Sequence, residues 1–122
     1  MCLKVKFASE YDVMKFLFLL VSLLSYSLHA NNLWCNGKIG GVYINKEGDV
    51  IVNATWRNDW TRICNLNTAG MQSTCPLWAS YAATAYQNQL NVRVMYSNAS
   101  SCDQLPTYNG APLPEYFMLG GG

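Results

Sequence analysis

Residues 63–96, ICNLNTAGMQSTCPLWASYAATAYQNQLNVRVMY, predict the end of a strand, a loop, a helix and a second strand. Side chains follow a helical spacing at Trp78, Tyr81, Ala82, Ala85 and Gln89, and all of these except Gln89 are apolar or aromatic; Leu77 and Tyr86 widen the apolar side. Proline suits the first turn of a helix, so we expect a helix from Pro76 to about Gln89 with Thr74 or Cys75 as its cap. Apolar residues then alternate over residues 92–96, which predicts a strand directly after the helix.

Two complete strands are predicted before this stretch, a third ends inside it, and one more follows it. Alternating residues predict strands at 38–44, 50–56 and 61–64, with polar turns at 45–48 and 57–59. Three prolines between residues 106 and 114 keep the following chain extended, and residues 116–119 can form a last strand. The resulting order β-β-β-α-β-β predicts an α+β fold. An open antiparallel sheet with one packed helix and a small OB-like barrel both fit it.

The N-terminal segment predicts export. Lys15 precedes the apolar run FLFLLVSLLSYSLHA, which ends in a small residue at Ala30, so residues 1–30 are interpreted as a signal peptide. Residues 1–13 are either a long leading region or lie before the true start at Met14. The strongly apolar part covers only residues 16–24, shorter than the roughly 20 residues that span a bilayer. We therefore expect one small domain at residues 31–122, secreted or periplasmic, without stable membrane insertion after cleavage.

The cysteines indicate two disulfides. The predicted domain holds Cys35, Cys64, Cys75 and Cys102, while Cys2 lies in the segment before it. An even number of cysteines in a small exported domain is typical of disulfide cross-linking, and four cysteines allow three connectivities. Of these we expect Cys64–Cys75, joining a strand end to the helix start, and Cys35–Cys102, joining the first strand to the last segment. Free thiols and a zinc site are the alternatives, but neither CxxC spacing nor a histidine supports zinc.

Charge and residue types exclude several classes of function. Basic and acidic side chains balance in residues 31–122; they are Lys38, Lys46, Arg57, Arg62 and Arg93 against Glu47, Asp49, Asp59, Asp103 and Glu115. Proteins that bind nucleic acid concentrate positive charge, so we expect no nucleic-acid partner. The only histidine, His29, lies in the predicted signal peptide, which removes Ser-His-Asp and Cys-His catalysis from the domain. We expect no metal and no cofactor. A small glycoside hydrolase using Asp59, Asp103 or Glu115 remains the catalytic alternative.

The segment Trp56-Arg57-Asn58-Asp59-Trp60 is the candidate ligand-binding site. Two tryptophans around a polar turn can stack on a sugar while Asn58 and Asp59 bond its hydroxyl groups. The alternative is structural: Trp56 belongs to the core and Arg57 pairs with Asp59 across the turn. Trp34, Tyr108 and Tyr116 add aromatic residues near the chain ends, which also suits a protein interface.

Several segments together resemble known proteins. They are WRNDW at 56–60, IC at 63–64, CPLW at 75–78, VRVMY at 92–96 and SCDQLPTYNGAPLPEY at 101–116. This series is similar to a group of small exported bacterial proteins of unassigned function, and the likeness covers nearly all of residues 31–122. The layout of export signal, disulfides, strands and one helix before late strands also resembles the receptor-binding B subunits of AB5-type toxins. Those subunits form pentamers of OB-like barrels and bind glycans, but no sugar-contacting residue matches here.

These observations predict an exported domain that binds rather than catalyses. The ligand that the residues favour is a glycan or a protein partner, and a homo-oligomer is compatible with the same surface. A structural or inhibitory protein of the cell envelope is the alternative.

Overall fold

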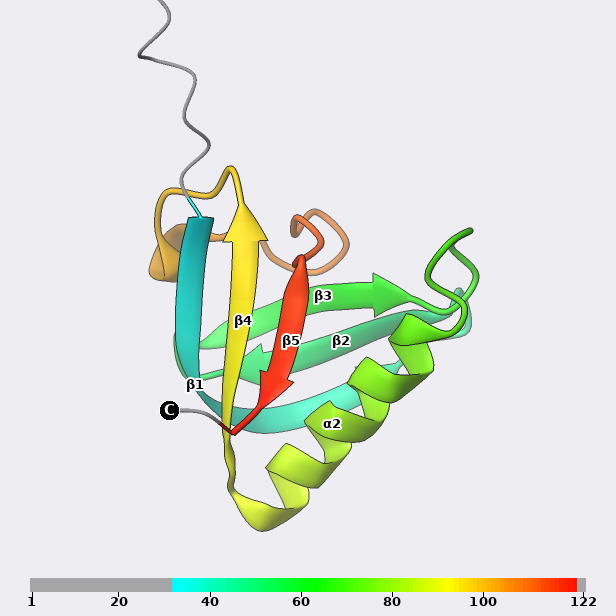
Figure 1. Cartoon of the computed structure of the whole chain (residues 1–122), viewed down its shortest axis with the longest axis horizontal. Helices are drawn as coiled ribbons and strands as arrows, with labels where there is room; N and C mark the ends of the chain where they lie inside the picture. Colours follow the sequence, from blue (N-terminus) through cyan, green and yellow to red (C-terminus); the bar gives the residue numbers. More distant parts are fainter. Residues whose placement is uncertain (1–31, 121–122) are drawn as a thin grey trace, which may run out of the picture. The chain divides into compact units, whose positions relative to one another are not determined.

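The computed structural model describes residues 32–120, which form one antiparallel five-stranded sheet and a packed α-helix (Figure 1). The elements in chain order are β1 (Asn32–Ile44), β2 (Asp49–Ala54), β3 (Asp59–Asn65), α2 (Thr74–Asn88), β4 (Asn91–Ser97), the 3-10 turn η2 (Cys102–Gln104) and β5 (Tyr116–Leu119). In the sheet the strands lie in the order β3-β2-β1-β4-β5. The predicted α+β class and element order are therefore confirmed. The predicted signal peptide, residues 1–30, lies outside the described residues.

The first strand organises the whole sheet. Its N-terminal half pairs with β4, from Asn32 opposite Ser97 to Lys38 opposite Asn91, and its C-terminal half pairs with β2. A bulge after Ile39 separates the two halves, as expected where paired glycines follow one another. Figure 1 shows the consequence: β1, β4 and β5 lie side by side, and β2 and β3 cross behind them. The predicted strand began only at Lys38, so the half of β1 that pairs with β4 was missed.

The helix covers the inner face of the sheet and contacts β1 most extensively (Figure 1). Its buried residues are Cys75, Trp78, Ala82 and Ala85, which pack on Val50, Val52, Ile63, Val92, Val94 and Phe117 in one core cluster. Alanines at two of the helical positions let the backbone approach the strands closely. Trp78, Ala82 and Ala85 belong to the predicted stripe, whereas Cys75 was expected only as a cap residue.

The helix ends differ from the prediction. Ser73 occupies the N-cap in place of Thr74 or Cys75, so the helix begins two residues before Pro76. At the other end Gln89 adopts a left-handed conformation with φ of 52°, and its N–H bonds the oxygen of Ala85. The apolar side is also narrower than predicted, because Leu77, Tyr81, Tyr86 and Gln89 are exposed.

The sheet is open. A closed barrel would require the two edge strands, β3 and β5, to pair, and among residues 32–120 they do not. A parallel bridge between Thr61 and Tyr108 joins β3 to the β4–β5 loop instead: the Tyr108 N–H donates to the oxygen of Trp60 and the Arg62 N–H donates to the oxygen of Tyr108. Of the two predicted architectures, the antiparallel sheet with one packed helix is the one observed.

Both expected disulfides are present. Cys35 bonds Cys102 and Cys64 bonds Cys75, with Cα–Cα distances of 5.8 and 5.6 Å. Two disulfides in so small a domain are typical of an oxidising compartment, outside the cell or in the periplasm. Within the described residues no helix is long and apolar enough to cross a membrane.

Candidate functional site

The outer face of β1, β4 and β5, which the helix does not cover, carries an exposed aromatic platform. Trp34, Met95 and Tyr116 lie directly opposite one another on the three strands, because Trp34 pairs with Met95 and Met95 pairs with Tyr116. The rings of Trp34 and Tyr116 are nearly parallel, with an interplanar angle of 9° and centroids 6.2 Å apart. We call these three residues the aromatic row.

The exposed fractions show how the aromatic row is arranged. Met95 lies outside the core cluster and its neighbours Val94 and Tyr96 point inward, so its side chain is on the outer face. It is nevertheless only 7% exposed, whereas Trp34 is 39% and Tyr116 is 56% exposed. The two rings therefore shelter the methionine between them and keep surface of their own in solvent. Large exposed aromatic side chains of this kind mark binding surfaces.

Arg93 lies beside the aromatic row. Its guanidinium carbon is 4.7 Å from the ring centroid of Trp34, a cation–π contact. Asn36 of β1 and Met118 of β5 flank Arg93 in the next row of the sheet. Within residues 32–120 the only ion pair joins Arg62 to Asp49, so no carboxylate neutralises Arg93.

Polar residues continue the outer face on both sides. By strand alternation Lys38, which pairs with Asn91, shares the face beyond Asn36 and Arg93. At the opposite end the Ser97 hydroxyl donates to the carboxylate of Glu115 across 3.1 Å. The aromatic row therefore has cationic groups along one side, and the acidic group at the other side is held by a hydrogen bond.

The two tryptophans of the predicted 56–60 site do not act as a pair. Trp56, in the turn after β2, is half-buried against the core cluster, and its Nε1 is enclosed without a hydrogen-bond acceptor. Trp60, in β3, lies over Gly41, where an added Cβ would come within 2.7 Å of the ring, and meets Tyr43 edge-on at 5.0 Å between centroids. Core packing, the structural alternative for Trp56, is the arrangement seen. No stacking platform is formed by these two rings together.

The three polar residues between those tryptophans serve the local structure. The Nε of Arg57 donates to the main-chain oxygen of Leu105 across 2.7 Å, and no Arg57–Asp59 ion pair is present among the described residues. Asn58 has a φ of 56°, which asparagine tolerates in a tight turn. Asp59 accepts the N–H of Trp60 at 2.7 Å. The segment positions the long β4–β5 loop, and its role as a ligand site stays a prediction.

That β4–β5 loop contains a shallow hollow of about 340 Å³. Amide and hydroxyl side chains line it together with small apolar ones, among them Asn98, Ser101, Gln104, Leu105 and Pro112. No lining residue is charged. The Cys35–Cys102 disulfide, the Arg57–Leu105 hydrogen bond and the Thr61–Tyr108 bridge hold the loop in place. The hollow is therefore rigid and neutral, and it lacks aromatic walls.

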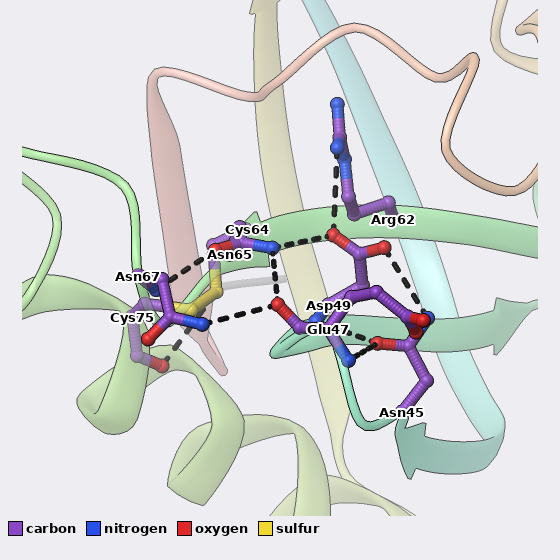
Figure 2. The surroundings of a disulfide bond; sticks show 8 residues. All are labelled: Asn45, Glu47, Asp49, Arg62, Cys64, Asn65, Asn67 and Cys75. Carbon is purple, nitrogen blue, oxygen red and sulfur yellow. Dashed lines mark hydrogen bonds and ion pairs between the residues drawn. A yellow bond between two sulfur atoms is a disulfide. The ribbon is translucent and has the colours of Figure 1, made fainter.

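A polar network at the other end of the sheet is structural (Figure 2). Asp49 is 7% exposed and accepts hydrogen bonds from Asn65 at 2.8 Å, from Asn45 at 3.2 Å and from Arg62 at 3.4 Å. The hydrogen bond from Asn65 contributes most to holding the pKa of Asp49 below its usual 3.8; burial opposes it, and Asn45 and Arg62 add to it. Both carboxylate oxygens are engaged, so the network closes the β1–β2 turn beside the Cys64–Cys75 disulfide and leaves no oxygen free for a ligand.

The acids of the hydrolase alternative are engaged separately. Asp59 bonds its own neighbour in β3, Asp103 accepts a hydrogen bond from the hydroxyl of Ser101, and Glu115 accepts that of Ser97. Among residues 32–120 no three His, Cys, Asp or Glu side chains gather in a way that would hold a metal ion. The arrangement gives no positive support to an acid/base site.

Comparisons with known proteins do not assign this chain to a family. No protein family model matches the chain, and no curated protein and no solved structure matches it. The functional argument therefore rests on the site itself. Sequence reasoning had noted Trp34 and Tyr116 only as aromatic residues near the chain ends, and the strand register that joins them through Met95 is what makes them a site.

Proposed function

We propose that this protein is a non-catalytic binding domain that works outside the cytoplasm and recognises a saccharide. The observation that carries the proposal is the aromatic row, in which Trp34 and Tyr116 lie nearly parallel and exposed on one face of the sheet. The C–H face of a pyranose ring is apolar and flat, so it packs on such rings without leaving its hydroxyl groups unsolvated. Asn36 and Arg93 beside the row supply hydrogen-bond donors for the ring hydroxyls.

Rigidity also favours this role. The three residues of the row lie on three strands of one sheet, and strands hold side chains more precisely than loops do. The Cys35–Cys102 disulfide begins one residue after Trp34. Little conformational entropy is then lost when a ligand binds, which matters for a weakly held ligand such as a sugar.

The proposal is tested by screening the disulfide-bonded domain, residues 31–122, against a broad glycan array and confirming hits by calorimetry. We expect binding by the native protein and at least about a tenfold weaker affinity for Trp34→Leu, because central aromatic residues dominate binding energies. Tyr86→Leu is the matched control, since Tyr86 is 46% exposed on the helix, away from the row. A native protein that binds no glycan, or a Trp34→Leu protein that binds as well as the native one, contradicts the proposal.

A protein partner is the second candidate, and helix α2 favours it. The helix contains no charged residue, and its outer side exposes Leu77, Tyr81 and Tyr86. An uncharged surface with exposed aromatics is typical of protein interfaces. Light scattering of the purified domain checks the simplest form, a homo-oligomer: we expect Leu77→Lys to reduce the molar mass if the helix forms the contact. A monomer across the concentration range removes this form of the second candidate.

A further inference from the structure

We infer that the saccharide taken by the aromatic row carries a carboxylate, which Arg93 binds. The inference rests on the proposed function, because it names the ligand class of that same site. The guanidinium group of Arg93 has no anionic partner among the described residues. Among residues 32–120 no carboxylate lies within ion-pair distance of Arg93, and its guanidinium donates no hydrogen bond to these residues.

The guanidinium group of Arg93 keeps donors available beside Trp34. The guanidinium carbon lies over the ring of Trp34, 4.7 Å from its centroid, and the N–H donors of a guanidinium lie in the plane of the group. The Nε is enclosed without an acceptor, but the two terminal nitrogens are not among the enclosed, unpartnered atoms of the described residues. They therefore reach solvent. Two parallel N–H groups in this geometry match the two oxygens of a carboxylate.

Arg93 also has a defined position relative to the ring of Trp34. The contact with Trp34 holds the charge at the border of the aromatic row, so a sugar stacked on Trp34 or Tyr116 brings a ring substituent beside it. A neutral hydroxyl at that position would accept a hydrogen bond from only one terminal nitrogen of Arg93, while a carboxylate accepts from both. The hydrogen-bonding geometry of Arg93 thus favours uronic or other acidic sugars over neutral ones.

Charge on the surrounding face agrees with this assignment. Lys38 is on the same face beyond Arg93, so the side of the row that holds Arg93 is cationic. The acidic residue at the other side, Glu115, is engaged by the hydroxyl of Ser97. An anionic group would therefore meet attraction at one side of the row and would be excluded from the other, which also gives the bound sugar a direction.

The experiment compares matched ligands on one array, each carboxylate-bearing glycan beside its methyl ester, and follows hits by calorimetry. We expect the native domain to prefer the acid by about tenfold or more, and the preference to shrink as salt rises from about 50 to 500 mM. Arg93→Gln should abolish the preference and keep binding of the ester. Lys46→Gln, which removes the same charge from an exposed turn, should keep the preference. Thermal unfolding of each variant establishes that it is folded.

Each outcome has one meaning. If acid and ester bind equally to the native domain, or if Arg93→Gln keeps the preference, the carboxylate assignment is overturned while the saccharide proposal stands. If no glycan binds in either form, the proposed function falls, and this assignment falls with it. The array also includes acetylated peptides rich in glutamate. If these peptides bind as tightly as the acidic glycans, the ligand is not a saccharide, and an acidic protein binds the outer face that holds the aromatic row.

Discussion

The Nε of Arg57 donates a hydrogen bond to the main-chain oxygen of Leu105 at 2.7 Å, although the two residues are 48 positions apart. This bond connects the β2–β3 turn with the loop that contains the neutral hollow. Leu105 is only 3% exposed, so its carbonyl has little access to water once Arg57 is gone. Hydrogen bonds to charged groups stabilise more than neutral ones do.

We therefore expect Arg57→Ala to lower the free energy of unfolding by about 1 to 2 kcal/mol, because the partner oxygen is left without its donor. Urea unfolding of the disulfide-bonded domain measures this. Lys46→Ala is the control: Lys46 is exposed in the β1–β2 turn, and such surface changes usually stay within about 0.5 kcal/mol. Equal midpoints for the two variants would show that the Arg57 contact does not stabilise the loop.

The two disulfides should differ in their contribution to stability. Cys35 and Cys102 are 67 positions apart, whereas Cys64 and Cys75 are 11 apart. A cross-link stabilises mainly by restricting the unfolded chain, and in the chain-entropy model these loops give about 4 and about 3 kcal/mol respectively. We expect the Cys35→Ala/Cys102→Ala protein to unfold at lower urea than the Cys64→Ala/Cys75→Ala protein. The reverse order would show that native packing around Cys64 and Cys75, both fully buried, outweighs chain entropy.

The parts of this structure that depend on nearby residues were predictable from sequence. Helix α2 and β4 follow from a change of apolar period within 63–96, and the Cys64–Cys75 bond joins the two ends of a short loop. The Cys35–Cys102 bond followed once the other pair was chosen. Sheet closure was not predictable, because it depends on whether β3 and β5 meet, and these strands are far apart in the chain.

The candidate site was only partly predictable for the same reason. A Trp-polar-Trp segment suggests a shared platform, but the turn at Asn58 sends Trp56 toward the core and Trp60 over Gly41. The aromatic row needs the register of three strands, and the half of β1 that holds Trp34 had not been predicted as a strand. Trp34 is an apolar residue at an outward position and Gly37 is an inward position without a side chain, so the apolar alternation is broken there and the strand is hidden.

Acid should weaken the fold through Asp49. Its pKa in the folded protein lies below the usual 3.8, so the unfolded chain takes up the proton first as pH falls. The stability that Asp49 contributes is therefore complete above the unfolded pKa and is lost as pH falls through the folded pKa. We expect the urea midpoint to decline below about pH 5, and Asp49→Asn to flatten part of that decline.

Asp49→Asn also has an expected effect at neutral pH. The new amide nitrogen would face the amide donors of Asn45 or Asn65, so the variant should be less stable than the native protein at pH 7. Asp103→Asn is the control, because Asp103 is exposed in η2. If Asp49→Asn keeps the full acid dependence of the native protein, another carboxylate is responsible for it.

The hydroxyl of Tyr96 should cost stability rather than add to it. Tyr96 is completely buried in the core cluster, and its oxygen has no hydrogen-bond partner among the described residues. A buried polar group without a partner loses its hydration and gains nothing in return. We expect Tyr96→Phe to leave the free energy of unfolding unchanged or to raise it by up to about 1 kcal/mol, which is unusual for a change in a core. Tyr86→Phe, at an exposed position, should have no effect.

Alkaline pH gives an independent check on Tyr96. Burial raises the pKa of Tyr96 from 10.0 to about 12, so the folded protein holds the phenolic proton after the unfolded chain has released it. Ionisation of Tyr96 therefore leaves the stability unchanged below pH 10 and lowers it as pH rises from 10 toward 12. Ultraviolet titration of the native protein should show an ionisation near pH 12 that is absent from Tyr96→Phe, and in denaturant this ionisation should move toward pH 10. If Tyr96→Phe destabilises the protein by more than about 1 kcal/mol, the hydroxyl has a polar partner in the core. If Tyr96→Phe leaves the titration of the native protein unchanged, the hydroxyl is not shielded from water.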